Sequence, residues 1–174
     1  MHGKAGKLMC LLMLAVFGWQ HLNADIQPPK REFRAVWVCT LANLDWPSKA
    51  GLHSDTQKAE FLKLLDRMER IGMNALIVQV RPAGDAFYPS KLSPWSQYLN
   101  GKQGKAPEPY YDPLAFMIEA CHERNIEFHA WFNPFRAVSH VQYSHVLSSH
   151  PSKLHPSWCF TYGNSKYYLS LIHI

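Results

Sequence analysis

The apolar positions of the chain fall into three short, dense runs separated by two longer stretches in which apolar residues recur with a helical period. The dense runs are Phe33–Thr40 (FRAVWVCT), Ala75–Val80 (ALIVQV) and Ile126–Pro134 (IEFHAWFNP). Such runs, rich in β-branched and aromatic residues, are typical of strands. Because the middle run is apolar at almost every position, we expect it to be covered on both faces, as parallel strands are.

The first helical stretch covers residues 54–74 and carries signals for its start and its end. Ser54 with Gln57 three residues later predicts a capping box, and Gly72 stands where a helix ends. One face of the stretch is apolar at Phe61, Leu65, Met68 and Ile71. The pattern therefore predicts an amphipathic helix that covers a sheet.

The second helical stretch, residues 112–125, begins with Asp112 and Pro113, which suit the N-cap and the first helical position. The order strand, helix, strand, helix, strand predicts an α/β fold with parallel strands and right-handed crossovers. The aromatic residues of the long loop 81–111 either form a surface for a sugar or pack over the sheet edge. Past Pro134 the pattern indicates no complete further strand-helix unit.

Residues 1–24 have the pattern of a secretory signal peptide. Lys4 and Lys7 precede an apolar run over residues 8–19, and Ala24 supplies a small residue at the exit. The run is shorter than the roughly 20 apolar residues that a membrane-spanning helix needs. We expect an exported protein of the periplasm or cell envelope, with no transmembrane segment after removal of the signal.

The charge of the chain gives little support for a nucleic-acid partner. The net charge is +5, from 18 Lys and Arg against 13 Asp and Glu. Removal of Lys4 and Lys7 with the signal leaves +3, and no Lys- or Arg-rich block remains. We therefore expect no nucleic-acid partner.

The cysteines and histidines do not form a metal-binding pattern. His140, His145, His150 and His155 recur without helical i,i+4 spacing and without a carboxylate among them. We expect no metal and no cofactor. Three cysteines remain after signal removal, Cys39, Cys121 and Cys159. Cys39 and Cys121 are interpreted as small buried apolar residues, and which cysteines could pair stays open.

Polar and aromatic side chains follow each predicted strand at its carboxyl end. They are Asp45 and Trp46 after the first strand, Arg81, Asp85 and Tyr88 after the second, and Asn133 and Arg136 after the third. Ligands of parallel α/β folds bind at this edge. Hydrogen-bonding groups beside flat rings suit a sugar, and arginine can also hold a carboxylate. These seven residues are the predicted substrate-binding residues.

Structural roles are the alternative for both acidic residues of this set. Asp85 could pair with Arg81 or cap a turn, and Asp45 could cap the loop before Trp46. Glycoside hydrolysis requires two carboxylates roughly 5 to 9.5 Å apart. Asp45 and Asp85 are the only pair at this predicted rim that could supply them.

Four longer motifs resemble successive segments of one family. REFRAVWVCT, GMNALIVQVRPAGDAFYPS, YDPLAFMIEACHERNIEFHAWFNPFR and HPSWCFTYGNSKYYL are similar to the glycosyl hydrolase-like family 10 domain, across residues 30–169. The resemblance implies a (β/α)8 TIM barrel in exported bacterial proteins, of which the first three strands and two helices are present here. It also implies glycoside hydrolase activity, in some members on peptidoglycan strands freed of their peptides.

The resemblance also sets the expected domain limits. After the signal peptide, residues 25–32 form a leader and 33–169 the N-terminal part of the barrel, while SLIHI at 170–174 is expected to be foreign to the domain. The acidic strand motif of the family is expected beyond Ile174. The catalytic residues are therefore unassigned, and the chain as given is expected to be inactive.

Two functions from different classes follow. The leading hypothesis is an exported glycoside hydrolase whose substrate is a bacterial cell-wall glycan, such as peptidoglycan, or a related polysaccharide. The alternative is a barrel that binds glycan without cleaving it. A metal-dependent deacetylase is disfavoured because the sequence shows no cluster of His and Asp ligands.

Overall fold

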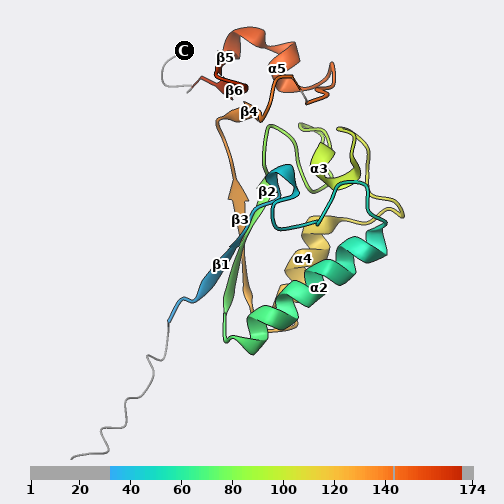
Figure 1. Cartoon of the computed structure of the whole chain (residues 1–174), viewed down its shortest axis with the longest axis vertical. Helices are drawn as coiled ribbons and strands as arrows, with labels where there is room; N and C mark the ends of the chain where they lie inside the picture. The colour runs from blue at the N-terminus through green and yellow to red at the C-terminus, as the bar shows by residue number, and fades with distance from the viewer. Residues whose placement is uncertain (1–31, 143, 170–174) are drawn as a thin grey trace, which may run out of the picture. The chain divides into compact units, whose positions relative to one another are not determined.

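The computed structural model describes residues 32–142 and 144–169 of the chain (Figure 1). The predicted signal peptide, nearly all of the predicted leader, and the tail at 170–174 lie outside the described residues. From Phe33 onward the described chain folds into one compact unit that contains two three-stranded sheets.

The first sheet is parallel and has the strand order β1-β2-β3. Its strands are β1 (Ala35–Val38), β2 (Ala75–Arg81) and β3 (Glu127–Phe132). The three predicted strands and their parallel pairing are therefore confirmed, within a mixed α/β fold. The central strand β2 is buried along most of its length, as its continuous apolar run predicts.

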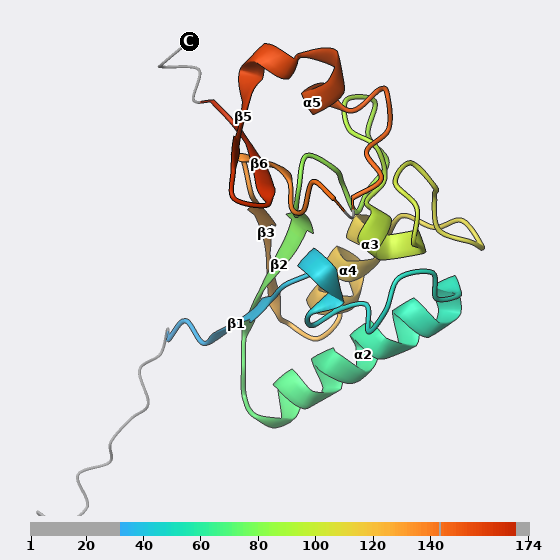
Figure 2. The same cartoon turned by 45° about the horizontal axis from the view of Figure 1, so that its top comes forward.

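Two helices, α2 (Ser54–Arg70) and α4 (Pro113–His122), cover one face of this sheet (Figures 1 and 2). The core between them is formed by Phe61, Leu65, Leu76, Val78 and Met117, all fully buried. Each such side chain contributes about 1.5–3 kcal/mol by leaving water. The helices are thus fixed by the apolar stripes that their sequence pattern indicates.

The opposite face of the first sheet remains open to solvent. Trp37 of β1 and Trp131 of β3 pack edge to face there, with ring centroids 5.1 Å apart. Trp37 is 60% exposed.

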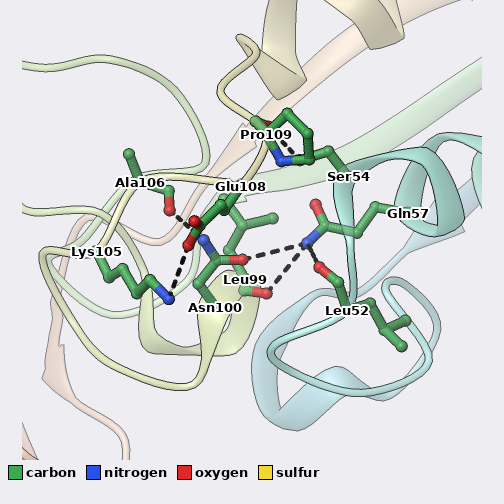
Figure 3. A network of polar contacts seen from close by, with 9 residues as sticks. All are labelled: Leu52, Ser54, Gln57, Leu99, Asn100, Lys105, Ala106, Glu108 and Pro109. Atoms are coloured by element: carbon green, nitrogen blue, oxygen red, sulfur yellow. Dashed lines mark hydrogen bonds and ion pairs between the residues drawn. The ribbon is translucent and has the colours of Figure 1, made fainter.

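The start of α2 differs from the predicted capping box. The N-cap is His53, whose Nδ1 accepts from the Asp55 N–H. Ser54 is buried in the first turn and donates its hydroxyl to the Pro109 carbonyl, while the Gln57 amide donates to Leu52 O at 2.8 Å. The capping-box prediction is wrong because both side chains tie loops to the helix instead (Figure 3).

The other predicted helix signals are confirmed. Gly72 has a φ of +73°, the left-handed conformation that ends a helix. Asp112 caps α4 through hydrogen bonds from the Leu114 and Ala115 N–H groups at 3.0 and 3.2 Å. Pro113 occupies the first turn of α4, where its missing donor costs nothing.

The long loop between β2 and α4 contains the short helix α3 (Gln97–Asn100) and packs inward. Phe87 and Leu99 are fully buried, and Tyr111 donates to the Gln57 side chain at 2.8 Å. Of the two alternatives for the loop aromatics, packing over the sheet edge therefore describes Phe87 and Tyr111.

The chain after β3 forms a second, antiparallel sheet with the order β4-β6-β5. Its strands are β4 (Arg136–Val138), β5 (Cys159–Tyr162) and β6 (Ser165–Tyr168), accompanied by the short helices α5 (Pro151–Leu154) and η2 (Pro156–Trp158). A further short helix, η1 (Leu41–Asn43), follows β1. The strands of the second sheet are short and mix polar with aromatic or aliphatic residues instead of forming a dense apolar run, so the sequence pattern does not indicate them. The sheet lies beyond the carboxyl ends of β2 and β3 (Figures 1 and 2).

None of the helices in the described ranges combines the length and apolar character needed to cross a bilayer. The described cysteines Cys39, Cys121 and Cys159 are free thiols, and Cys121 is buried as predicted.

Gly84, in the turn after β2, lies close to His150 and to Tyr168 of the second sheet. A Cβ on Gly84 would lie 2.6 Å from His150 Nε2 and 2.9 Å from Tyr168 Oη. Its φ of +67° is also a conformation that favours glycine. No larger residue fits here unless His150 and Tyr168 move.

We expect Gly84→Ala to destabilise the protein much more than Gly72→Ala does. Both glycines have a similar positive φ, but a Cβ on Gly72 would meet no atom within 4 Å. The control Gly72→Ala should therefore lower the free energy of unfolding by about 1 kcal/mol, through backbone strain alone. Gly84→Ala should lower it by about 1–3 kcal/mol more, through overpacking. Urea unfolding measures both. Equal losses would contradict the close approach.

Candidate functional site at the carboxyl ends of β2 and β3

A cleft of about 290 Å³ lies where β2 and β3 end, against the second sheet. It is lined by Arg81, Gly84, Phe132, Asn133, Pro134 and Tyr168. Two of the seven predicted binding residues, Arg81 and Asn133, thus meet in one cleft. Their neighbours Phe132 and Tyr168 are not among the predicted residues.

Backbone hydrogen bonds hold the walls of the cleft together. The Asn133 N–H donates to Arg81 O at 3.0 Å, which continues the pairing of β3 with β2. The Tyr168 N–H donates to Phe135 O at 2.7 Å, which places β6 against the turn after β3. The Arg136 N–H donates to Asn133 Oδ1 at 3.2 Å and orients the Asn133 amide. The cleft is therefore framed by main-chain contacts.

The guanidinium of Arg81 is fixed by a side-chain contact. Its Nη2 donates to Ser93 Oγ at 2.5 Å, and Arg81 is half-buried at the edge of the cleft. A charged donor that is held in place loses little side-chain entropy when it binds an anion or a hydroxyl.

A bulge in β2 explains why Phe132 faces the cleft. Gln79 pairs with Trp131, but the next pair is Arg81 with Phe132, so Val80 is the extra residue of β2. Simple alternation along β3 places Trp131 and Asn133 together and Phe132 on the other side. The bulge brings Phe132, which is 51% exposed, beside Arg81.

Tyr168 supplies a hydroxyl that has no hydrogen-bond partner within the described part of the chain, although its oxygen is buried. Burial raises the pKa of Tyr168 to about 12, so the phenol stays protonated and can donate. A buried polar atom without a partner is costly, and a ligand hydroxyl or anion in the cleft would satisfy it.

His150 supports the cleft from beneath the Gly84 turn. It is fully buried, and burial lowers its pKa, so the ring is neutral. Its Nδ1 accepts from the Ser152 N–H at 3.1 Å, which assigns the ring proton to Nε2, facing the backbone of Ala83 and Gly84. His150 is therefore a packing residue of the site rather than part of its lining.

Asp85 is buried and does not line the cleft. It is 1% exposed, and its Oδ1 accepts from the Ala83 N–H at 3.1 Å. Burial raises the pKa of Asp85 to about 6, against the opposing effects of the Ser96 hydroxyl, the Ala83 N–H and the Arg81 charge. The structure places Asp85 in the turn-capping position that was the alternative to substrate binding.

The other predicted residues do not line the cleft. The Asp45 carboxylate accepts from the Cys39 N–H at 2.7 Å and borders a separate groove between β1 and α2. Trp46 is not on the rim: it is 1% exposed, packs on Phe61 and donates its indole N–H to Gln57 O. The remaining two are Tyr88, packed against the core, and Arg136, in β4.

Of the predicted binding residues, Arg81 and Asn133 line the cleft. Phe132 and Tyr168 also line it, although the sequence pattern does not identify them. Phe132 follows Trp131 directly, and only the β2 bulge assigns it to the cleft. Tyr168 stands within the motif HPSWCFTYGNSKYYL, but no strand pattern links that motif to Arg81. Within the described ranges no group of three His, Cys, Asp or Glu residues could hold a metal.

We expect Asp85→Asn to remove a pH dependence of stability. A carboxyl with a raised pKa stabilises the folded state while protonated, so this contribution is present below pH 4 and is lost as the pH rises through 6. The loss is up to about 3 kcal/mol at 1.36 kcal/mol per pKa unit. Asn keeps an acceptor for the Ala83 N–H and does not titrate.

Urea unfolding between pH 4 and pH 7 measures this effect. The control Asp66→Asn changes an exposed carboxylate that contacts Arg124, and it should retain the wild-type loss. An Asp85→Asn variant that loses stability over this range as wild type does would show that Asp85 is not the titrating group.

Comparison with known proteins relates these features to one family. The family model described as glycosyl hydrolase-like 10 matches residues 32–172. Glycosyl hydrolase YngK of Bacillus subtilis (strain 168) is 55% identical over 139 residues, which are 79% of this chain and 27% of that protein. Glycosyl hydrolase DigH of Escherichia coli (strain K12) is 39% identical over 120 residues, 65% of this chain and 27% of that protein.

The chain thus spans about a quarter of the length of these two relatives. The family match, by contrast, includes every residue of the two sheets and of the cleft. On that match, the chain belongs to the glycosyl hydrolase-like 10 family.

Proposed function

We propose that this chain forms part of a (β/α)8-barrel glycoside hydrolase that acts on a bacterial cell-wall glycan, and that the Arg81–Tyr168 cleft binds this glycan. The family membership and the parallel β1-β2-β3 sheet support the barrel. The observation that carries the proposal is the cleft itself, which joins a fixed cation, an amide and an unpartnered phenol to an exposed aromatic ring.

This combination suits a sugar ring. Phe132 offers a flat apolar surface, while Arg81, Asn133 and Tyr168 offer hydrogen-bonding groups for hydroxyls. Because Arg81 and Tyr168 are held by their surroundings, they can orient the sugar without first becoming ordered. The role of the cleft in the reaction is to position the glycan.

Bond cleavage requires two carboxylates beside the glycosidic bond. No cleft-lining residue in the described ranges is acidic, Asp85 lies beneath the surface, and Asp45 borders a different groove. We therefore assign binding to these residues and leave the acid and the nucleophile unassigned. A glycan-binding barrel without hydrolysis is the second candidate, and the same observation favours it.

The experiment is to incubate the full chain with purified peptide-free peptidoglycan strands, then measure binding by sedimentation and cleavage by released reducing ends. Binding with cleavage supports the hydrolase, and binding without cleavage supports the second candidate for this chain. Failure to bind would contradict the assignment of the cleft.

We expect Tyr168→Phe to weaken glycan binding about tenfold, because the variant loses a hydrogen bond worth about 1.4 kcal/mol but keeps the ring. Tyr167→Phe is the matched control, since Tyr167 is the next residue of β6 and stacks on Phe160 instead of lining the cleft. Arg81→Lys should weaken binding as well, because a lysine cannot reproduce the planar fork of donors. Equal affinity of Tyr168→Phe and Tyr167→Phe would remove Tyr168 from the site.

We also propose that the protein is exported and that residues 1–24 are removed, which rests on the basic start, the apolar run and Ala24. When the chain is produced in a Gram-negative host, N-terminal sequencing of the periplasmic fraction should begin at Asp25. The control Leu12→Arg interrupts the apolar run and should keep the protein inside the cell. Exported material that starts at Met1 would contradict the proposal.

A further inference from the structure

A second pocket, of about 400 Å³, is lined by residues of β4, β6, α5 and the loop after α3. Its polar lining consists mainly of Lys102, Ser144, His145, Ser152, Lys153 and Lys166. These residues come from the loop after α3, from the segment before α5, from α5 and from β6. We call it the basic pocket.

The basic pocket gathers positive charge without a compensating acid. Lys102, Lys153 and Lys166 all line it, and no Asp or Glu does. Within the described ranges none of the three forms an ion pair, whereas Lys105 pairs with Glu108 at 3.3 Å. Like charges that share a pocket repel each other, so an anion between them is stabilised by all three.

One hydroxyl of the pocket, that of Ser144, adds a directed hydrogen-bond donor. Ser144 Oγ accepts from Gln97 Nε2 at 3.4 Å, which leaves its own proton for a ligand. Ser152 is buried and donates its hydroxyl to His150 Nδ1 at 2.8 Å, so its position is fixed and its proton is already used. Cations together with a hydroxyl donor are suited to bind the oxygens of a carboxylate or a phosphate.

The basic pocket adjoins the glycan cleft along β6. Lys166 and Tyr168 are two residues apart in a regular strand, so both project from the same side, roughly 6.6 Å apart along it. Ser152 of the pocket holds His150, which in turn lies over Gly84 of the cleft. The cleft and the basic pocket are therefore neighbours along one strand.

We infer that the basic pocket binds an anionic substituent, a carboxylate or a phosphate, of the same glycan chain whose neighbouring unit occupies the Arg81–Tyr168 cleft. This inference rests on the proposed function for the identity of the polymer. It makes the pocket a specificity site, which selects charged glycans over neutral ones of the same backbone.

The test compares wild type with a pocket variant that carries Lys102→Gln, Lys153→Gln and Lys166→Gln. Its matched control carries Lys49→Gln, Lys63→Gln and Lys91→Gln, which remove the same charge from exposed lysines outside the pocket. Thermal melts of the three full-length proteins establish that all are folded.

Three ligands are titrated calorimetrically: peptide-free strands with native carboxylates, the same strands with carboxyls reduced to alcohols, and reduced strands that carry phosphate monoesters. We expect wild type and the control to bind one or both charged strands about tenfold more tightly than the reduced strands. The pocket variant should bind all three alike. Which charged strand wild type prefers identifies the substituent.

Two results would overturn the inference. One is a pocket variant that keeps the wild-type preference for charged strands. The other is a control variant that loses as much affinity as the pocket variant, since net charge alone would then explain the binding.

A failure of the proposed function can be separated from a failure of the pocket. If wild type binds no strand, glucuronate and inorganic phosphate are titrated into the ¹⁵N-labelled full chain. Saturable amide shifts at Ser152 and Lys166 that the pocket variant lacks would support an anion site independent of glycan. No shifts in wild type would overturn the pocket itself.

Discussion

The close approach at Gly84 is the constraint on which both candidate sites depend. The turn after β2 allows His150 and Tyr168 to pack where a side chain would otherwise stand. Tyr168 can therefore face Arg81 across the cleft, and Ser152, through His150, is held at the edge of the basic pocket. The missing Cβ of Gly84 thus allows His150 and Tyr168 to pack on the turn after β2.

The buried polar groups around this turn explain how it keeps its shape. Asp85 accepts from the Ala83 N–H, and His150 accepts from the Ser152 N–H, so each satisfies a backbone donor next to the contact. Burying a carboxyl and an imidazole costs free energy, and hydrogen bonds offset part of that cost. In both groups burial favours the neutral form, since it raises the pKa of Asp85 and lowers that of His150. Below pH 6 the turn therefore carries little charge, and above it the buried Asp85 carboxylate lies near the Arg81 cation that faces the cleft.

The sequence predicts the parts of this structure that depend on local pattern. The three parallel strands follow from dense apolar runs, and Asp112, Pro113 and Gly72 mark helix ends through interactions within a few residues. Arg81 and Asn133 are found because parallel strands bring their carboxyl ends to one edge.

What the sequence does not predict depends on contacts between distant segments. Trp46 follows the first strand, where a residue of the binding edge is expected, but its indole packs beside Phe61 and so belongs to the core. Ser54 and Gln57 match a capping box, yet the loop around Pro109 competes for the same groups. Phe132 enters the cleft only through a bulge at Val80, and Tyr168 only through a sheet whose strands are too short to show a period.

The same limit applies to the distribution of charge. The lysines at 102, 153 and 166 are far apart in the chain, so no basic block is visible, and net charge argues only against a nucleic-acid partner. Folding over Gly84 brings them into one pocket beside the cleft, where they can distinguish a charged glycan from a neutral one. Specificity of this kind arises from the tertiary placement of charges, which explains why a low overall charge is compatible with selection of an anionic ligand.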